Sequence, residues 1–177
     1  FQRLLNTHYK FGSDTEVNEN RDAIVKIASQ CNADRRRNPF CLVSAEQTHS
    51  KNVRVIIEQN LIRSLKDEIP DTDAFITNRP GILLMVKTAD CQPIFLYDPV
   101  RKACGIVHSG WRGTIQNIVG ETISAMTQSF DSRAADILVA VGPSLGPCHS
   151  EFLEREKDFQ GFEPYFIENS RVDLLAI

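Results

Sequence analysis

The sequence has no apolar run long enough to cross a lipid bilayer, and even its longest runs, such as residues 82–86, are only as long as a buried strand. It also lacks an excess of positive charge, because 20 Lys and Arg against 23 Asp and Glu give a net charge of -3. No global basic surface would therefore draw the chain to nucleic acid or to a membrane, and we expect neither as a partner. No signal peptide is visible, and a chain that starts at Phe1 indicates that the natural N-terminus lies further upstream.

The chain also lacks a disulfide framework, since its five cysteines are odd in number and scattered. This pattern is typical of reduced thiols, so we predict a cytoplasmic protein. The hydrophobic content of 42% and the length of 177 residues suit one globular domain with a substantial core. Only four histidines and one tryptophan are present, so the positions of these residues are informative.

Apolar patterning predicts strands interspersed with helices. Helical spacing favours helices over residues 16–29 and 114–130, the second with the clearer apolar stripe. Apolar runs bounded by turn residues predict strands. These runs lie around residues 40–43, 53–57, 74–77, 82–88, 93–97, 103–107 and 137–141, and the last is expected to be buried. The fold class is therefore α/β (α+β), a single domain with a mixed β-sheet flanked by helices.

The turn-like sequence "DPVRK" predicts that the runs 93–97 and 103–107 form an antiparallel hairpin. If Tyr97 faces Ala103, Gln92 lies opposite His108 and Cys91 is next to it. The run 82–88 ends at the same edge, and the helix that follows Gly113 begins there. We expect this edge to form a crevice that binds a ligand.

Cys91 and His108 suit chemistry at such a place, because a thiolate and an imidazole can share a metal or form a nucleophile–base pair. Either residue alone is more often structural, since free cysteine is commonly buried and a histidine at a strand end is commonly just hydrogen-bonded. Their coincidence with a Gly-flanked Trp-Arg favours the functional interpretation. His49, in the polar turn "EQTHS", is the third candidate, although a surface histidine is the commoner case in such a turn.

Arg112 and two glycines extend the candidate site. Arg112 precedes the predicted helix and is a bidentate donor suited to phosphate or carboxylate, while a helix N-terminus also suits an anion. Gly110 and Gly113 would permit close approach of a ligand. Asp90 is placed to orient His108, although a turn residue bonded to its own backbone is the commoner case.

The segments "TADCQPIFLYDP", "VHSGWRGT" and "QTHS" resemble the signatures of the YfiH-like laccase-domain family, also called the multicopper polyphenol oxidase or purine nucleoside phosphorylase family. "DTDAFITNRPGILLMVKTADC" and "VAVGPSLGPCHSEF" fit the same family in order and spacing. The resemblance covers nearly the whole chain, so we expect residues 1–177 to form one YfiH-like domain. Family members also carry N- and C-terminal segments that have no counterpart here, which could include substrate-binding arginines.

The resemblance implies that His49, Cys91 and His108 bind a metal, usually zinc, and form the active site. It implies phosphorolysis of adenosine, inosine and methylthioadenosine, together with deamination of adenosine, so that a purine nucleoside and phosphate are the expected small-molecule partners. It also implies a single α/β domain likened to Cys-His hydrolases. It does not define the oligomeric state.

Other functions remain open from the residues themselves. A Cys-His hydrolase would use Cys91 as nucleophile and His108 as base, without a metal. A multicopper oxidase needs more histidines than the four available, although a single copper also suits imidazole and thiolate ligands. A binding module without catalytic activity is the third alternative.

Overall fold

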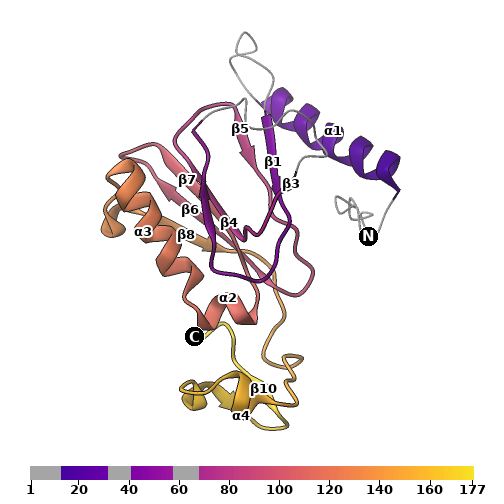
Figure 1. The fold of residues 1–177 in the computed structure, drawn as a ribbon, viewed down its shortest axis with the longest axis vertical. Helices are drawn as coiled ribbons and strands as arrows, with labels where there is room; N and C mark the ends of the chain where they lie inside the picture. The colour runs from indigo at the N-terminus through magenta and orange to yellow at the C-terminus, as the bar shows by residue number, and fades with distance from the viewer. Residues whose placement is uncertain (1–12, 32–40, 58–67) are drawn as a thin grey trace.

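Two β-sheets organise the part of the chain that this computed structural model describes, residues 13–31, 41–57 and 68–177. One is a mixed five-stranded sheet of order β2-β4-β7-β6-β8, and the other is a parallel three-stranded sheet of order β3-β1-β5 (Figure 1). The strands of the first are β2 (Val53–Val55), β4 (Ala74–Thr77), β6 (Gln92–Asp98), β7 (Ala103–Ser109) and β8 (Leu138–Val141), and those of the second are β1 (Cys41–Ala45), β3 (Glu68–Ile69) and β5 (Ile82–Leu84). The predicted mixed α/β fold is confirmed, with a second, parallel sheet beside the mixed one.

The predicted hairpin forms, but its register differs by one residue from the prediction. His108 lies opposite Pro93 rather than Gln92, because Asp98 pairs with Ala103 and shortens the turn. The Asp98 carboxylate accepts hydrogen bonds from the backbone N–H groups of Val100 and Arg101, which stabilises this tighter turn. Cys91 still immediately precedes β6, so the hairpin carries Cys91 and His108 to one end of the sheet.

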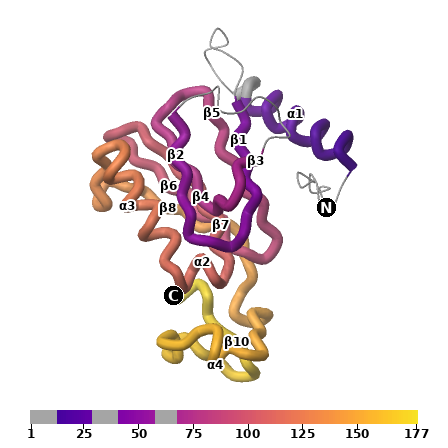
Figure 2. The backbone as a smooth tube through the Cα atoms, in the orientation of Figure 1, coloured from indigo at the N-terminus to yellow at the C-terminus, as the bar shows by residue number. Residues whose placement is uncertain are grey.

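Helices and the second sheet cover the two faces of the five-stranded sheet. On one face, alternate residues of β4, β6 and β7 pack against helix α3 (Ile118–Phe130), with Ile76, Val107 and Met126 fully buried. On the other face, Phe75 of β4 packs with Val43 of β1 in a second apolar cluster between the sheets. Helix α1 (Asp14–Cys31) lies beside β1 (Figure 2). The guanidinium of its Arg21 donates a hydrogen bond to Ser44 of β1.

The predicted helix over residues 114–130 is divided in two. A short helix α2 (Trp111–Ile115) ends before Asn117, which has a left-handed φ of 57°, and α3 starts after it. Asn tolerates this conformation, and its side-chain oxygen accepts a bond from the Gly120 N–H as the N-cap of α3. The apolar stripe extends across the break and therefore did not reveal it.

The expectation that residues 137–141 are buried is wrong. Among the strands described, β8 lies at the edge of the sheet beside β6, and its Leu138, Val139 and Val141 are all more than half exposed. An apolar run predicts a strand equally well in either position.

The C-terminal residues form a small unit beyond α2, with α4 (Arg155–Asp158), β9 (Phe166–Ile167) and β10 (Arg171–Val172) (Figure 1). Trp111 packs in it against Phe159, at 5.2 Å between ring centroids, so its ring fills an apolar cluster. Two 3₁₀ turns, at Ala134–Asp136 and Glu163–Tyr165, complete the described elements. Among the residues described, no helix has the length and apolar character that crossing a membrane requires.

Candidate functional site

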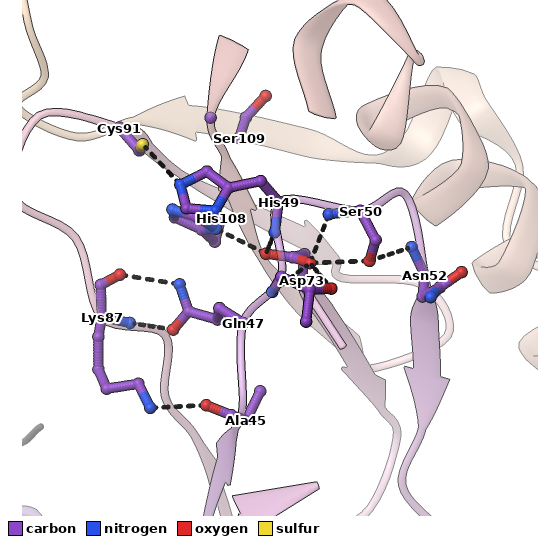
Figure 3. A network of polar contacts seen from close by, with 12 residues as sticks. Ala45, Gln47, His49, Ser50, Asn52, Asp73, Lys87, Cys91, His108 and Ser109 are labelled. Atoms are coloured by element: carbon purple, nitrogen blue, oxygen red, sulfur yellow. Dashed lines mark hydrogen bonds and ion pairs between the residues drawn. The ribbon is translucent and has the colours of Figure 1, made fainter. Parts of the chain in front are cut away.

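His49, Cys91 and His108 come together although they belong to three separate segments. His49 lies between β1 and β2, Cys91 directly before β6, and His108 near the end of β7. One potential ligand atom from each residue lies within 4.8 Å of the other two (Figure 3). The Cys91 Sγ is 3.8 Å from the Nε2 of His49. In the parts of the chain that the structure describes, this is the one His/Cys/Asp/Glu group with such geometry.

Asp73 fixes the orientation of the His108 ring. The Nδ1 of His108 lies 2.7 Å from the Asp73 carboxylate, which is completely buried, so the ring donates there and its Nε2 remains available. Burial alone would raise the pKa of Asp73, but bonds from His108 and Ser50 outweigh it and lower this pKa to about 2. Burial likewise opposes the charge on His108, yet its bonds to Asp73 and Cys91 raise its pKa to about 9. The Asp73 carboxylate therefore favours the protonated ring, which must release its Nε2 proton before a metal can bind there.

The same carboxylate holds the segment that carries His49. It accepts hydrogen bonds from the backbone N–H groups of Thr48, His49 and Ser50, at 3.2, 3.1 and 2.7 Å. His49 has a φ of 61°, which is uncommon for a residue with a side chain and is held by these contacts. Burial lowers the pKa of His49, and the neighbouring charge on His108 adds to this shift. The neutral imidazole that a metal requires is thereby favoured.

Gly110 provides the room in which the three side chains meet. A Cβ at this position would lie 2.6 Å from the Cδ2 of His49 and 3.2 Å from the Sγ of Cys91. The φ of Gly110 is -72°, which any residue adopts, so space and not backbone freedom requires glycine here. Two imidazoles and one thiolate are also a donor set that suits a metal with an open coordination position. The three residues therefore fit a bound metal ion.

Arg112 follows Gly110 by two residues, with an exposed side chain whose guanidinium carbon is 4.5 Å from the centroid of the Trp111 ring. Burial and the charge on His108 are the main causes of the lowered pKa of His49, and the Asp73 charge opposes them. The Arg112 charge makes a smaller contribution that also lowers this pKa. The helix that begins at Trp111 is only five residues long, so the contribution expected from a helix N-terminus is small.

Sequence reasoning missed Asp73 and considered Asp90 for its task, with a turn residue as the commoner case. The Asp90 side chain is exposed, and its backbone carbonyl accepts a bond from Leu145. Asp73 directly precedes β4, and the pairing of Ala74 with Val107 places it opposite His108. A carboxylate directly before a predicted strand was the available signal, but the sequence did not reveal which strand pairs with it. His149 belongs elsewhere, beside Cys148 in an exposed loop.

The fold and the site define a mixed α/β protein with a candidate metal centre of two histidines and a cysteine. The chain belongs to the family described as multi-copper polyphenol oxidoreductase laccase, whose model matches residues 3–171. This confirms the family resemblance.

Curated relatives and solved structures agree with this membership. The chain is 32% identical over 154 residues to the purine nucleoside phosphorylase YlmD of Bacillus subtilis, covering 85% of this chain and 53% of the relative. It is 29% identical over 171 residues to a purine nucleoside phosphorylase of Bacteroides thetaiotaomicron, covering 95% and 60%. The crystal structure of YlmD from Geobacillus stearothermophilus has a TM-score of 0.77 at 27% identity, covering 94% of this chain and 60% of that one. The chain thus spans between half and two thirds of the length of these proteins.

Proposed function

We propose that this protein is a metal-dependent purine nucleoside phosphorylase whose metal is held by His49, Cys91 and His108. The observation that supports this most is the convergence of the three ligand atoms within 4.8 Å, in a family whose curated relatives carry that name. Two imidazoles and one thiolate suit zinc best, and copper is the second metal that such ligands bind. A bound zinc would supply Lewis acidity at the open end of the site.

The chain's own residues then have separate tasks. Asp73 keeps the proton on Nδ1 of His108 and thereby leaves Nε2 for the metal. Arg112 is the proposed phosphate-binding residue, because its exposed guanidinium is near enough to affect the charge of His49 and can form two parallel bonds to an oxyanion. Adenosine, inosine and methylthioadenosine are the proposed phosphorolysis substrates, and adenosine is also the proposed substrate of deamination. The protein is proposed to act in the cytoplasm.

Two alternatives use the same residues. A Cys-His hydrolase would use Cys91 as a nucleophile without a metal, and it predicts rapid alkylation of that thiol. A polyphenol oxidase with several coppers requires more ligands than this sequence offers, since it has four histidines and the described residues form one ligand cluster. Oxidase chemistry would therefore have to use a single copper ion bound at this centre.

The test is chromatography of products from adenosine, with and without phosphate, using the purified full-length protein loaded with zinc. Adenine that forms only with phosphate supports phosphorolysis, and inosine that forms without phosphate supports deamination. Neither product from a folded, zinc-loaded protein would overturn the purine assignment and favour the hydrolase.

A pair of arginine variants tests the phosphate site in the same assay. Arg112→Ala should raise the KM for phosphate about tenfold or more, as loss of a charged hydrogen-bonding partner does. Arg133→Ala removes an arginine that is 79% exposed and outside the cluster, and it should leave this KM unchanged.

A further inference from the structure

Gln47 forms an unusual bridge between two segments near the candidate centre. Its side-chain oxygen accepts a bond from the backbone N–H of Lys87 at 2.7 Å, and its side-chain nitrogen donates to the Lys87 carbonyl at 2.8 Å (Figure 3). One amide side chain thus satisfies both backbone groups of a single residue, as a neighbouring strand would. We call this pair of bonds the Gln47 clamp.

The clamp continues the pairing of β1 and β5 beyond the ends of both strands. The register pairs Val43 with Leu84, and the next bond runs from the Met85 N–H to the Val43 carbonyl at 2.9 Å. The clamp then joins the chain that leaves β1 to the chain that leaves β5. The first of these chains reaches His49 two residues later, and the second reaches Cys91 four residues later.

Lys87 is a firm point of attachment because its side chain is bonded as well. Its ammonium group is 8% exposed, and it donates to the Ala45 carbonyl and to Glu68, each at 2.6 Å. Glu68 also accepts a bond from Arg21 of α1 at 2.6 Å. The position of the Lys87 backbone is therefore set by a buried ionic network that the clamp itself does not contain.

His49 is the ligand that needs such positioning. Cys91 directly precedes β6 and His108 lies in the neighbouring β7, whereas His49 lies in the connection that leaves β1 of the other sheet and enters β2 four residues later. Its positive φ persists only where surrounding contacts hold it. Asp73 holds the segment from the His108 side, and the clamp holds it from the Cys91 side.

We propose that Gln47 is a positioning residue of the metal centre, whose clamp on the Lys87 backbone holds His49 against Cys91. This inference rests on the proposed metal centre. Loss of the clamp leaves the His49 segment bonded to residues 69–73, which end in Asp73, through Glu46, Thr48 and the backbone of His49. Without a bond toward Cys91, the ring of His49 moves while Cys91 and His108 stay in place. The metal then loses one well-placed imidazole and gains a more open, more hydrated coordination.

The first test is cobalt titration of the metal-free, full-length protein as wild type, Gln47→Ala, Gln47→Glu and Gln128→Ala. Cobalt reports tetrahedral coordination by its visible bands and the Cys91 thiolate by a charge-transfer band. Gln47→Ala should bind about tenfold more weakly, in the range seen when residues that support ligands are removed, with weaker visible bands and a retained thiolate band. Gln47→Glu keeps the acceptor and loses the donor, so its loss should be smaller. Gln128→Ala, at an exposed glutamine of α3, should match wild type.

Ile123→Ala separates positioning from general stability. It removes an apolar side chain of α3 that packs against the core cluster away from the centre, so it should lower Tm while leaving the cobalt spectrum close to wild type. The inference is overturned if Gln47→Ala gives the wild-type spectrum and affinity. It is also overturned if Ile123→Ala and Gln47→Ala change the spectrum alike, since the effect would then follow stability alone.

A second readout works without any metal. In imidazole ¹⁵N–¹H NMR spectra of the metal-free protein, Gln47→Ala should shift the ring signals of His49 and leave those of His108, which Asp73 holds, nearly unchanged. Unmoved His49 signals overturn the inference. If wild type fails to bind cobalt, the proposed metal centre fails, and these spectra still decide whether the clamp positions His49.

Discussion

The two histidines of the candidate centre are held in opposite ways. His108 lies in a strand with neighbours on both sides, is 3% exposed and has its ring bonded to a buried carboxylate. His49 lies in a connecting segment with a positive φ, and polar contacts to its backbone hold it. The sheet therefore fixes one ligand, whereas the other depends on a few specific hydrogen bonds.

Asp73 connects the two cases, because one carboxylate serves both histidines. It bonds the ring of His108 and the backbone of the His49 segment, and Gln47 supplies the second attachment of that segment. The comparison predicts that variants at Asp73 affect both ligands, while variants on the His49 side affect one.

The largest effect is expected from Asp73→Asn, which removes the shared attachment. The buried carboxylate accepts several bonds that an amide cannot all replace, so unfolding free energy should fall by about 3 kcal/mol, as for a broken buried charge pair. Zinc affinity should fall about 100-fold, the upper range for such second-layer residues. Urea unfolding and chelator competition measure the two effects. Asp131→Asn, at an exposed helix C-cap where Asn is equally suited, is the control. Loss of zinc affinity without loss of stability would show that Asp73 does not secure the fold.

Gly110→Ala should affect the centre but spare the fold. The added Cβ would displace His49 and press on Cys91, while the φ of -72° suits alanine, so zinc affinity should fall at least tenfold with a nearly unchanged Tm. Gly146→Ala is the matched control, since its Cβ would meet only the Sγ of Cys148 at an ordinary 3.7 Å. Equal zinc affinity in both variants would contradict the tight packing around Gly110.

The same comparison explains which parts of the site the sequence could predict. The β6–β7 hairpin depends on local alternation and a recognisable turn, so the approach of Cys91 to His108 followed from the residues themselves. His49 became a strong candidate only through the family resemblance, because nothing local distinguishes a ligand from an ordinary turn histidine. Its place beside Cys91 depends on how two sheets pack.

Asp73 and Gln47 could not be found in this way, since each acts through a pairing between distant segments. Asp73 faces His108 through the β4–β7 pairing, and Gln47 meets Lys87 forty residues along the chain. The break at Asn117, in contrast, has a local signal, because Asn is a common N-cap. The apolar stripe continues across it and therefore favoured one long helix. The exposure of β8 follows from its edge position, which composition does not encode.

Acid should weaken the ionic network that holds Lys87. Burial opposes the charge on Glu68, but bonds from Lys87 and Arg21 outweigh it and lower its pKa below 4.5. A lowered pKa stabilises the folded state above about pH 4.5, and this contribution is lost as pH falls through the folded-state pKa. Glu68→Gln should therefore cost about 2 kcal/mol at pH 7, and the difference from wild type should shrink at lower pH. Urea unfolding across pH 3 to 7 measures it, and a difference independent of pH would contradict the role of this charge.

The smallest effect is expected from Ser50→Ala, which tests how strongly the position of His49 depends on a single side-chain bond to Asp73. The Ser50 hydroxyl donates to Asp73 at 2.7 Å, but the backbone N–H groups of Thr48, His49 and Ser50 remain bonded to the same carboxylate. The hydroxyl also accepts a bond from the Asn52 N–H at 3.2 Å, at an exposed position. Stability should fall by about 1 kcal/mol with the loss of these two bonds, and zinc affinity should change less than twofold. Gln47→Ala removes bonds between neutral groups and should nevertheless disturb the metal more, because the clamp lies nearer to His49 than the bond from Lys87 to the Ala45 carbonyl does and joins the His49 segment to the chain that reaches Cys91. If Ser50→Ala weakened zinc binding as much as Gln47→Ala, the position of His49 would depend on each bond to Asp73. The view that these bonds can replace one another, while the Gln47 clamp cannot be replaced, would then be wrong.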